Sequence, residues 1–469
     1  MRILEATTFY RQAGGAEIYM HQVAAGLEAR GHEVAIFAGD PDEGRDEERL
    51  RVVQRPDFHA GRLLRDEELS AAFEELCDRF RPDLVHLHNT YSFPAEFPEV
   101  IGRAAKRHGA PVCQTVHDWS LLCANGWCVV PPSEGQDFRV CEGGAGQKCF
   151  ERGCEANYPY DARIVLAAVA RANSARAAVT NFTAPSSFLT GMLEQHGLGP
   201  AHALPLWIEP DSFGGADGIG AFEAAKAETE RDPDRMLFVG RIDKEKGLEF
   251  LVRALPAIRA GNPRARLELV GDGTEVDALR ALADELGVGD ALVLHGRVPH
   301  DAVLRHLAGA AVHVFPSVWC ENSPLTCYEC LLAGTPMAAS DIAGLPEMVR
   351  EGETGILMRP RDPEHIAERL GGLLGDRELQ ARLSAGCAAA VPRYSREAHL
   401  DRLEEVFAEA RALGPKLGDA AAHDTDLFTA MHAVLDKAKE VEDWANGMHG
   451  HLLHLEAQKT KGILGRLRG

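Results

Sequence analysis

The stretch 236–247, MLFVGRIDKEKG, decides the fold that the sequence predicts. Its first five residues have the composition of a buried strand and end at a glycine. A loop with Arg241 and Lys246 follows, and a helical pattern begins directly after it at Leu248. This arrangement favours an anion, because the backbone amides and the dipole of a helix start add to the two cations. The stretch therefore predicts one unit of a parallel α/β sheet with a phosphate site at its strand end.

The same unit repeats through the second half of the chain. Strand-like runs are expected at 236–240, 267–271, 291–295, 312–316 and 337–340. Helical patterns follow them at 248–259, 275–285, 301–308, 325–333 and 345–350. The first half repeats the theme with strands at 2–6, 32–38, 83–88 and 111–116 and a helix at 16–30. The sequence therefore predicts an α/β fold with two doubly wound, Rossmann-like domains that face each other across a cleft.

Changes in composition indicate where these parts begin and end. We expect a first domain over 1–205, with a Cys-rich insertion at 119–160, and a second domain over 206–390. A crossover helix at 391–412 is expected to follow, and then an amphipathic helical tail over 413–469. Apolar or small residues in the tail follow a heptad spacing, and its last eleven residues carry four basic side chains and no acid. The tail could pack on the body, mediate self-association or contact an anionic membrane surface.

Composition and charge exclude several classes of protein. The chain has 469 residues with 45% hydrophobic and 26% charged side chains, as globular proteins have. The formal net charge of −21 disfavours a nucleic acid partner, because an acidic surface repels a phosphate backbone. The amino-terminal residues lack the long apolar segment of a signal peptide, and no apolar run is long enough to span a membrane. We therefore expect a cytoplasmic protein, with peripheral contact at the inner membrane face through the tail as a further option.

A second strand end, 317–329, reads SVWCENSPLTCYE and predicts another part of the same site. A helix is expected to start near Pro324, with Asn322 and Ser323 as its caps. The amides of Leu325 and Thr326 would then point out of the helix start toward a phosphate. Two carboxylates flank this start. Glu321 precedes it in the same crevice, and Glu329, one turn further in, could accept two hydroxyl protons of a ribose.

Several short motifs, taken in order, carry a resemblance to a known family. They are Gly14-Gly15-Ala16-Glu17, Gly240-Arg241-x4-Lys246-Gly247, Val270-Gly271-Asp272-Gly273, His295-Gly296-Arg297-Val298, Glu321-x7-Glu329 and Ala343-Gly344-Leu345-Pro346-Glu347. Over roughly residues 1–412 the chain resembles the retaining glycosyltransferases of family 4, the group 1 type, which have the GT-B fold. The resemblance implies transfer of a sugar from a nucleoside diphosphate to an acceptor hydroxyl, with retention of the anomeric configuration.

The resemblance also implies roles for individual residues. Arg241 and Lys246 would hold the diphosphate of the donor, most simply UDP or GDP. Glu329 would bind the ribose, Glu321 would contact the hydroxyls of the donor sugar, and the backbone at Arg297 and Val298 would contact the base. Donor-binding residues are therefore expected among Gly14, Gly15, Arg241, Lys246, Arg297, Val298, Glu321, Ser323, Leu325, Thr326 and Glu329.

His117 is the candidate catalytic residue of the first domain, beside Glu321, Arg241 and Lys246 of the second. It follows a predicted strand and matches the histidine that the family places near the donor sugar. A single histidine without further context is more often structural. The position of His117 at the end of a predicted strand, together with the match to the family, favours a functional role instead. Because Arg241 and Lys246 can stabilise the departing diphosphate electrostatically, we expect no catalytic metal or other cofactor.

The Cys-rich insertion contains five of the eleven cysteines, Cys123, Cys128, Cys141, Cys149 and Cys154. Four thiolates could hold a structural zinc ion that staples an irregular loop. Their spacings are looser than the usual pairs of zinc ligands, so an iron–sulfur cluster, disulfides or packed thiols stay open. The insertion lies on the acceptor side of the cleft and is expected to shape acceptor binding.

Two other functions fit the same scaffold. A nucleotide-sugar 2-epimerase-like enzyme would need acid and base carboxylates and no acceptor, and a partner subunit without activity could have kept the fold. Retention of Arg241, Lys246, Glu321, Glu329 and His117 argues against an inactive subunit. The acceptor could be a glycan, a lipid-linked glycan or a small molecule, and the basic tail favours cell-surface polysaccharide or glycoconjugate synthesis.

Overall fold

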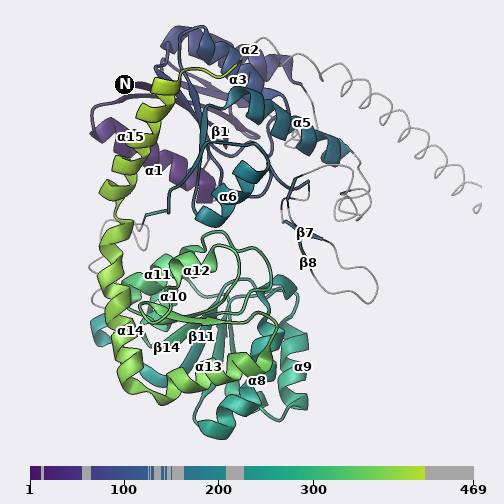
Figure 1. Cartoon of the computed structure of the whole chain (residues 1–469), viewed down its shortest axis with the longest axis vertical. Helices are drawn as coiled ribbons and strands as arrows, with labels where there is room; N and C mark the ends of the chain where they lie inside the picture. Colours follow the sequence, from purple (N-terminus) through teal and green to yellow (C-terminus); the bar gives the residue numbers. More distant parts are fainter. Residues whose placement is uncertain are drawn as a thin grey trace, which may run out of the picture.

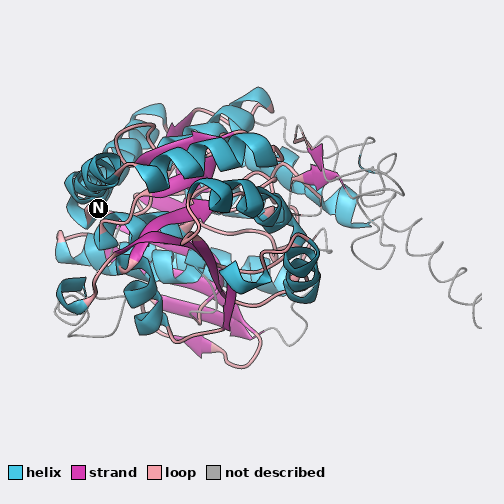
Figure 2. Cartoon of the chain, turned by 90° about the horizontal axis from the view of Figure 1, so that it is seen from below, coloured by secondary structure: helices cyan, strands magenta, loops and turns pink. Residues whose placement is uncertain are grey.

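The computed structural model describes residues 1–11, 15–54, 65–124, 126, 128–130, 139–141, 143–144, 149, 163–207 and 226–417. These residues form two α/β domains that stack along the long axis of the molecule (Figure 1). In both domains helices cover the strands of a central sheet (Figure 2). Gly14, Cys154 and the tail from 418 to 469 lie outside the described residues, and so do the predictions that rest on them.

The first domain is built on an eight-stranded sheet. Its strands are β1 (Arg2–Phe9), β2 (Glu33–Asp40), β3 (Arg45–Asp46), β4 (Leu50–Gln54), β5 (Leu84–Leu87), β6 (Val112–Thr115), β9 (Asn181–Ala184) and β10 (Ala201–Ala203). They lie in the order β10-β9-β6-β5-β1-β2-β4-β3, and each neighbouring pair is parallel except β3 with β4. The helices are α1 (Gly15–Ala29), α2 (Glu67–Phe80), α3 (Phe97–Lys106), α5 (Arg163–Ala178) and α6 (Ser187–Gln195). Within the Cys-rich insertion, β7 (Val129–Val130) and β8 (Arg139–Val140) form an antiparallel pair that the sequence did not predict.

The second domain has a six-stranded, wholly parallel sheet. Its strands are β11 (Asp232–Val239), β12 (Arg266–Val270), β13 (Leu292–Gly296), β14 (Ala310–Phe315), β15 (Met337–Ser340) and β16 (Gly355–Met358), in the order β13-β12-β11-β14-β15-β16. The helical segments are η4 (Lys244–Lys246), α8 (Leu248–Gly261), α9 (Val276–Glu285), η5 (Gly289–Ala291), α10 (His300–Ala308), α11 (Leu325–Ala333), α12 (Leu345–Met348), α13 (Pro363–Gly375), α14 (Arg377–Ala390), η6 (Val391–Tyr394) and α15 (Arg396–Leu413). The predicted parallel, doubly wound organisation is thereby confirmed.

The strand order reverses at one point in each sheet. In the second sheet the chain winds outward from β11 through β12 to β13, and then returns to add β14 on the other side. In the first sheet β1 is flanked in the same way by β2 and β5. Loops that leave neighbouring parallel strands at such a reversal diverge to opposite faces, and a crevice forms between them. Both crevices open toward the interface between the domains, where the candidate site lies.

The last helix, α15, returns from the second domain and packs on the first (Figure 1). Leu400, Leu403 and Phe407 are buried in a cluster with Ile3 and Leu27 of the first domain. Arg30, which directly follows α1, forms ion pairs with two carboxylates of α15, at 2.7 and 2.9 Å. Among the described residues, none of the helices combines the length and the apolar character that a membrane span needs.

Candidate functional site

Two loops of the second domain meet at the reversal of its sheet. One loop follows β11 and runs from Gly240 to Gly247, and the other follows β14 and leads from Pro316 into α11. The amide of Val318 donates a hydrogen bond of 3.0 Å to the carbonyl oxygen of Glu245, which joins the loops backbone to backbone. Gly247 has a φ of +67°, and a Cβ at this position would lie 2.1 Å from the carbonyl oxygen of Pro316. The approach of the two loops therefore depends on a residue without a side chain.

A cavity of about 530 Å³ lies between these loops and the first domain. Of the predicted site residues, Gly15 and His117 line it from the first domain, and Arg241, Glu321, Ser323 and Leu325 line it from the second. The structure thus brings together residues that are more than 300 positions apart in the sequence. The wall also contains side chains that the sequence did not single out, namely Asp118, Trp119, Pro185, Leu206 and Trp319.

The remaining described residues of the predicted site do not lie on the wall of this cavity. Lys246 reaches it through a hydrogen bond to Glu321, and Thr326 lies in the first turn of α11. Glu329 is buried one turn deeper in the same helix, with 7% of its surface exposed. Arg297 and Val298 follow strand β13, which lies at the edge of the sheet and is separated from β14 by β12 and β11.

Lys246 and Glu321 form a nearly buried ion pair. The Nζ atom of Lys246 lies 2.6 Å from Oε1 of Glu321, and the hydroxyl of Ser317 donates to the same oxygen at 2.8 Å. The ammonium also stands 5.3 Å from the centre of the Trp319 ring, within the range of a cation–π contact. The sequence placed both charges in one crevice, but it gave no sign that they hold each other in position.

Arg241 lies at the mouth of the cavity, where 53% of its side chain is exposed. Its guanidinium forms ion pairs with Asp243 at 2.8 Å and with Glu245 at 2.7 Å, which orient it along the loop. An anion that enters the cavity would therefore meet a guanidinium that is already positioned and still accessible to solvent.

The start of α11 differs from the sequence prediction in one respect. Pro324 occupies the N-cap position, so Asn322 and Ser323 stand too early in the chain to cap the helix, and that prediction was wrong. The hydroxyl of Ser323 instead forms a hydrogen bond of 2.7 Å with that of Tyr328. None of the described side chains caps α11, so its first turn meets the cavity at Leu325 without a protein carboxylate or hydroxyl in the way.

Burial raises the pKa of Glu329 to about 7. The cause is desolvation, because a carboxylate loses its hydration inside the protein and the neutral acid is favoured. At neutral pH this side chain is therefore close to half ionised, which makes its capacity to accept two hydrogen bonds dependent on pH.

His117 lies two residues after the end of β6 and is half-buried at the wall of the cavity. Tyr19 of α1 packs edge-on against its ring, with a distance of 5.0 Å between the ring centres. Its Nε2 atom lies 3.4 Å from Nδ1 of His88, which directly follows β5. Burial and the neighbouring histidines lower the pKa of His117, so the imidazole is neutral at physiological pH.

Contacts between the domains include two that sequence reasoning missed. Glu347 of α12 caps α6 of the first domain, since its carboxylate accepts from the amides of Ser187 at 2.7 Å and Phe188 at 2.8 Å. Ser186 donates to the side-chain oxygen of Asn322 at 2.5 Å. The motif around Glu347 was visible in the sequence, but its partner lies 160 residues away, and only the fold brings the two together.

Four of the five cysteines of the insertion are described, and all four are buried. Cys123, Cys128 and Cys141 belong to the same apolar cluster as Cys320 of the second domain, whereas Cys149 packs in a separate small cluster. Among the described residues, no three cysteines bring their sulfur atoms within 4.8 Å of one another. The zinc site, which also involves Cys154, stays a prediction.

Comparisons with known proteins identify the family to which both domains are similar. Residues 14–148 match the family model described as glycosyl transferase 4-like domain, and residues 221–387 match the model of glycosyl transferases group 1. D-inositol 3-phosphate glycosyltransferase of Acidothermus cellulolyticus is 34% identical over 186 residues, which are 38% of this chain and 41% of the relative. The enzyme of the same name from Thermobispora bispora is 27% identical over 429 residues, which are 85% of this chain and 90% of that protein.

Solved structures share the arrangement of the two domains. The Anabaena protein HepE, solved in complex with UDP, superimposes with a TM-score of 0.57 at 15% identity. The superposition covers 87% of this chain and all of HepE. Such a likeness shows the fold alone, and this fold is GT-B. With matching family models on both domains, the chain belongs to the group 1 glycosyltransferases, as its motifs predicted.

Proposed function

We propose that this protein transfers a hexose from a uridine diphosphate donor to an acceptor hydroxyl, with retention of the anomeric configuration. One observation carries the proposal. A single cavity between the domains joins Arg241, Glu321 and the start of α11 with His117 on the opposite wall. Cations and a helix start suit a diphosphate, whereas a carboxylate and a neutral imidazole suit the hydroxyls of a sugar.

The reaction separates charge, because an oxocarbenium-like sugar and a leaving diphosphate develop together. Arg241, Lys246 and the start of α11 stabilise the leaving diphosphate, so the site supplies charge that is in place before the reaction begins. Glu321 links Lys246 to the cavity and accepts hydrogen bonds from the sugar. The acceptor approaches from the side of the departing phosphate, which takes its proton, and the configuration is therefore retained.

The choice of uridine rests on structural neighbours, because HepE was solved with UDP and with UDP-glucose. For the acceptor we propose a growing glycan or glycoconjugate of the cell surface. The basic carboxyl-terminal residues 459–469 support contact with an anionic membrane face, where lipid-linked glycans are assembled. We propose that the protein acts on the cytoplasmic side of that membrane.

A panel of nucleotide sugars tests the proposed donor. We expect UDP-hexoses to bind the full-length protein with a Kd in the micromolar range, and mass spectrometry to detect slow release of UDP without an acceptor. GDP-sugars at the same concentration serve as the comparison for the base. Absence of binding by every nucleotide sugar would overturn the proposal, and conversion of the donor into its 2-epimer would replace it with the epimerase.

The raised pKa of Glu329 predicts a dependence of donor binding on pH. The ionised fraction of a group with a pKa of about 7 rises from about 0.1 at pH 6 to about 0.9 at pH 8. If only the carboxylate accepts the two ribose hydroxyls, binding of UDP-glucose tightens about tenfold over this range. UDP-glucose is the right probe because its esterified diphosphate does not titrate between these pH values.

The matched variant for this measurement is Glu329→Gln, which keeps the size of the side chain but cannot ionise. At pH 8 we expect the variant to bind UDP-glucose more weakly than the wild-type protein does. Its own affinity should be the same at pH 6 as at pH 8. Isothermal titration calorimetry at both pH values measures the two affinities. An equal change in affinity for both proteins between pH 6 and pH 8 would show that another group titrates.

A further inference from the structure

We propose that Glu5 and His88 are positioning residues that hold His117 in one tautomer, with the proton on Nε2 and the lone pair on Nδ1. The proposal rests on the proposed function only in so far as His117 serves the reacting sugar. Its first step concerns the resting protein and can be tested without any substrate.

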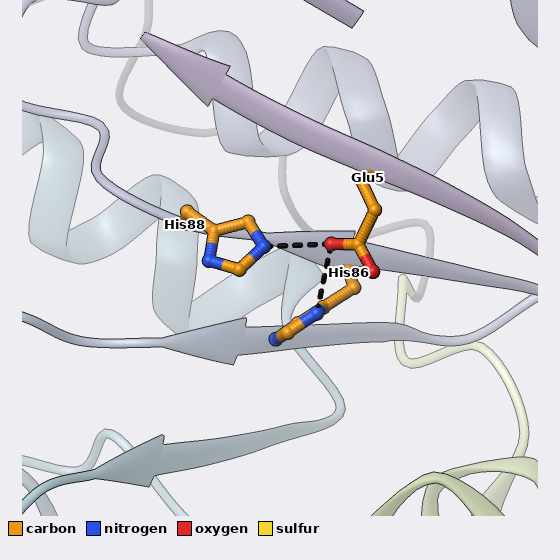
Figure 3. Close-up of side chains that lie close together, drawn as sticks. All are labelled: Glu5, His86 and His88. Carbon is orange, nitrogen blue, oxygen red and sulfur yellow. Dashed lines mark hydrogen bonds and ion pairs between the residues drawn. The ribbon is translucent and has the colours of Figure 1, made fainter. Parts of the chain in front are cut away.

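The three side chains form a line of contacts across the reversal of the first sheet. Glu5 lies on β1, and His88 follows the neighbouring strand β5 (Figure 3). Oε2 of Glu5 is 2.6 Å from Nε2 of His88, and Nδ1 of His88 is 3.4 Å from Nε2 of His117. The rings of His88 and His117 lie nearly parallel, at an angle of 17°. Glu5 and His88 are completely buried, so water does not compete for these contacts.

Elementary hydrogen-bond chemistry fixes the protons along this line. Two histidines outweigh the effect of burial and lower the pKa of Glu5 to about 2, so the group is a carboxylate that can only accept. Burial lowers the pKa of His88 to about 4, so its ring carries a single proton at neutral pH. That proton must lie on Nε2, which faces the carboxylate. Nδ1 of His88 is then an acceptor, and Nε2 of the neutral His117 must donate to it.

In the part of the chain that the structure describes, the side chains around His88 do not supply another donor to its Nδ1. His86 on β5 turns its Nδ1 toward the same oxygen of Glu5, at 2.9 Å, and its Nε2 contacts the hydroxyl of Thr115 at 2.7 Å. Tyr19 of α1 directs its hydroxyl to Nε2 of His399 of α15, at 2.8 Å. His399 in turn donates from Nδ1 to the carbonyl oxygen of Pro205, at 2.8 Å, which leaves its Nε2 to accept.

A metal ion bound by Glu5, His86 and His88 is the competing interpretation, because their ligand atoms lie within 4.8 Å of one another. The distances argue against it. Ligand atoms around a tetrahedral zinc ion lie about 3.3 Å apart, given bonds of about 2.0 Å. Here Oε2 of Glu5 lies 2.6 and 2.9 Å from the two nitrogens, which are hydrogen-bond distances. The gap of 2.6 Å to His88 therefore suits a proton better than an ion, whereas Nδ1 of His86 stands 2.9 Å from the same oxygen without forming a hydrogen bond to it.

As a consequence, the histidine at the wall of the cavity has one defined donor nitrogen and one defined acceptor nitrogen. With Nε2–H directed to His88, the lone pair of His117 belongs to Nδ1, and a neutral ring with this tautomer accepts a hydrogen bond from a hydroxyl. The same logic operates where a buried carboxylate orients the histidine of a hydrolytic triad. Here a histidine is inserted between the carboxylate and the ring that it orients.

Nuclear magnetic resonance tests the first step directly. The full-length protein is labelled with ¹⁵N in its histidines, and the signals of His117 are identified by their absence in His117→Gln. Long-range ¹⁵N–¹H correlations then show which ring nitrogen carries the proton. We expect Nε2–H in the original protein, and a dominant Nδ1–H tautomer would overturn the proposal whatever the activity of the protein.

Variants of His88 test the step from tautomer to turnover. His88→Asn keeps an acceptor close to the position of Nδ1, whereas His88→Leu removes it. We expect His88→Leu to mix the tautomers of His117 and to lower kcat by at least about tenfold with little change in the KM of the donor. His88→Asn should recover most of both losses, which a purely structural role would not predict.

Two further outcomes would count against the proposal. The first is that His88→Leu and His88→Asn have equal kcat values and both keep the Nε2–H tautomer of His117. This result would show that His88 does not determine the tautomer of His117. Metal analysis runs in parallel, and an equivalent of zinc or iron that is present in the original protein but absent from His88→Leu would favour the metal site. If no sugar transfer is found with any donor, the tautomer in the resting protein still decides the first step.

Discussion

Replacement of Lys246 by glutamine is expected to lower kcat/KM by about 10²- to 10³-fold without unfolding the protein. The ammonium lies 2.6 Å from Glu321 at the edge of the cavity, in surroundings that exclude most water. A charge in such a place interacts more strongly with a developing anion than a charge in solvent does. Glutamine can still donate to Glu321, so the variant removes the charge and keeps the hydrogen bond.

The measurement is the initial rate of UDP release from the preferred donor, with circular dichroism to confirm the fold. Arg253→Gln is the matched control, because Arg253 also carries a cation on the segment that follows β11. Its partner there is Glu249 on the exposed face of α8, at 2.8 Å. We expect no change for this control, since surface ion pairs of this kind contribute little. A Lys246→Gln variant with full kcat/KM would remove the lysine from the proposed reaction.

Gly247→Ala is expected to destabilise the second domain by about 3 kcal/mol and to weaken donor binding. Two effects add up. A positive φ of +67° is unfavourable for any residue with a Cβ, and the new methyl group would stand 2.1 Å from the carbonyl oxygen of Pro316. The overlap involves backbone rather than a flexible side chain, so the two loops of the donor site must move apart. Thermal unfolding followed by circular dichroism measures the loss of stability.

Gly287→Ala separates the two effects. Gly287 has a similar φ of +70°, but a Cβ there would meet no heavy atom within 4 Å. Its replacement should cost about 1 kcal/mol, which is the conformational part alone. It should also leave the affinity for UDP-glucose unchanged, because the residue lies at the end of α9, away from the cavity. Equal losses of stability in both variants would show that the loops do not depend on their close approach.

The sequence predicted most of the second domain because its signals are local. Helix α11 and strand β15 have the bounds that were expected, 325–333 and 337–340, since apolar runs there are separated by glycine and proline. The two loops of the proposed donor site were also placed correctly, because each follows a strand end. Their close approach at Gly247 was not predicted, since it depends on two loops that are about 70 residues apart in the sequence.

The first domain was harder to predict for a physical reason. Strands β9 and β10 and helices α2, α3, α5 and α6 were not among the elements that the sequence predicted. The cap on α6 by Glu347 and the line from Glu5 through His88 to His117 depend on strand order and domain contact. Spacing along the chain carries no information about such pairs. His117 itself could be found because it follows a predicted strand and matches a histidine of the family that the chain resembles.

The return of α15 to the first domain has a consequence for how the protein is made. Leu400 and Phe407 of α15 pack against Ile3 and Leu27 of the first domain. An apolar cluster that includes the third residue of the chain is therefore completed by residues near position 400. During synthesis the first domain emerges from the ribosome with this apolar face uncovered, and it stays so until the second domain has followed. The first domain thus buries this face only when the chain is complete. A truncated product would expose an apolar surface that chaperones and proteases can recognise.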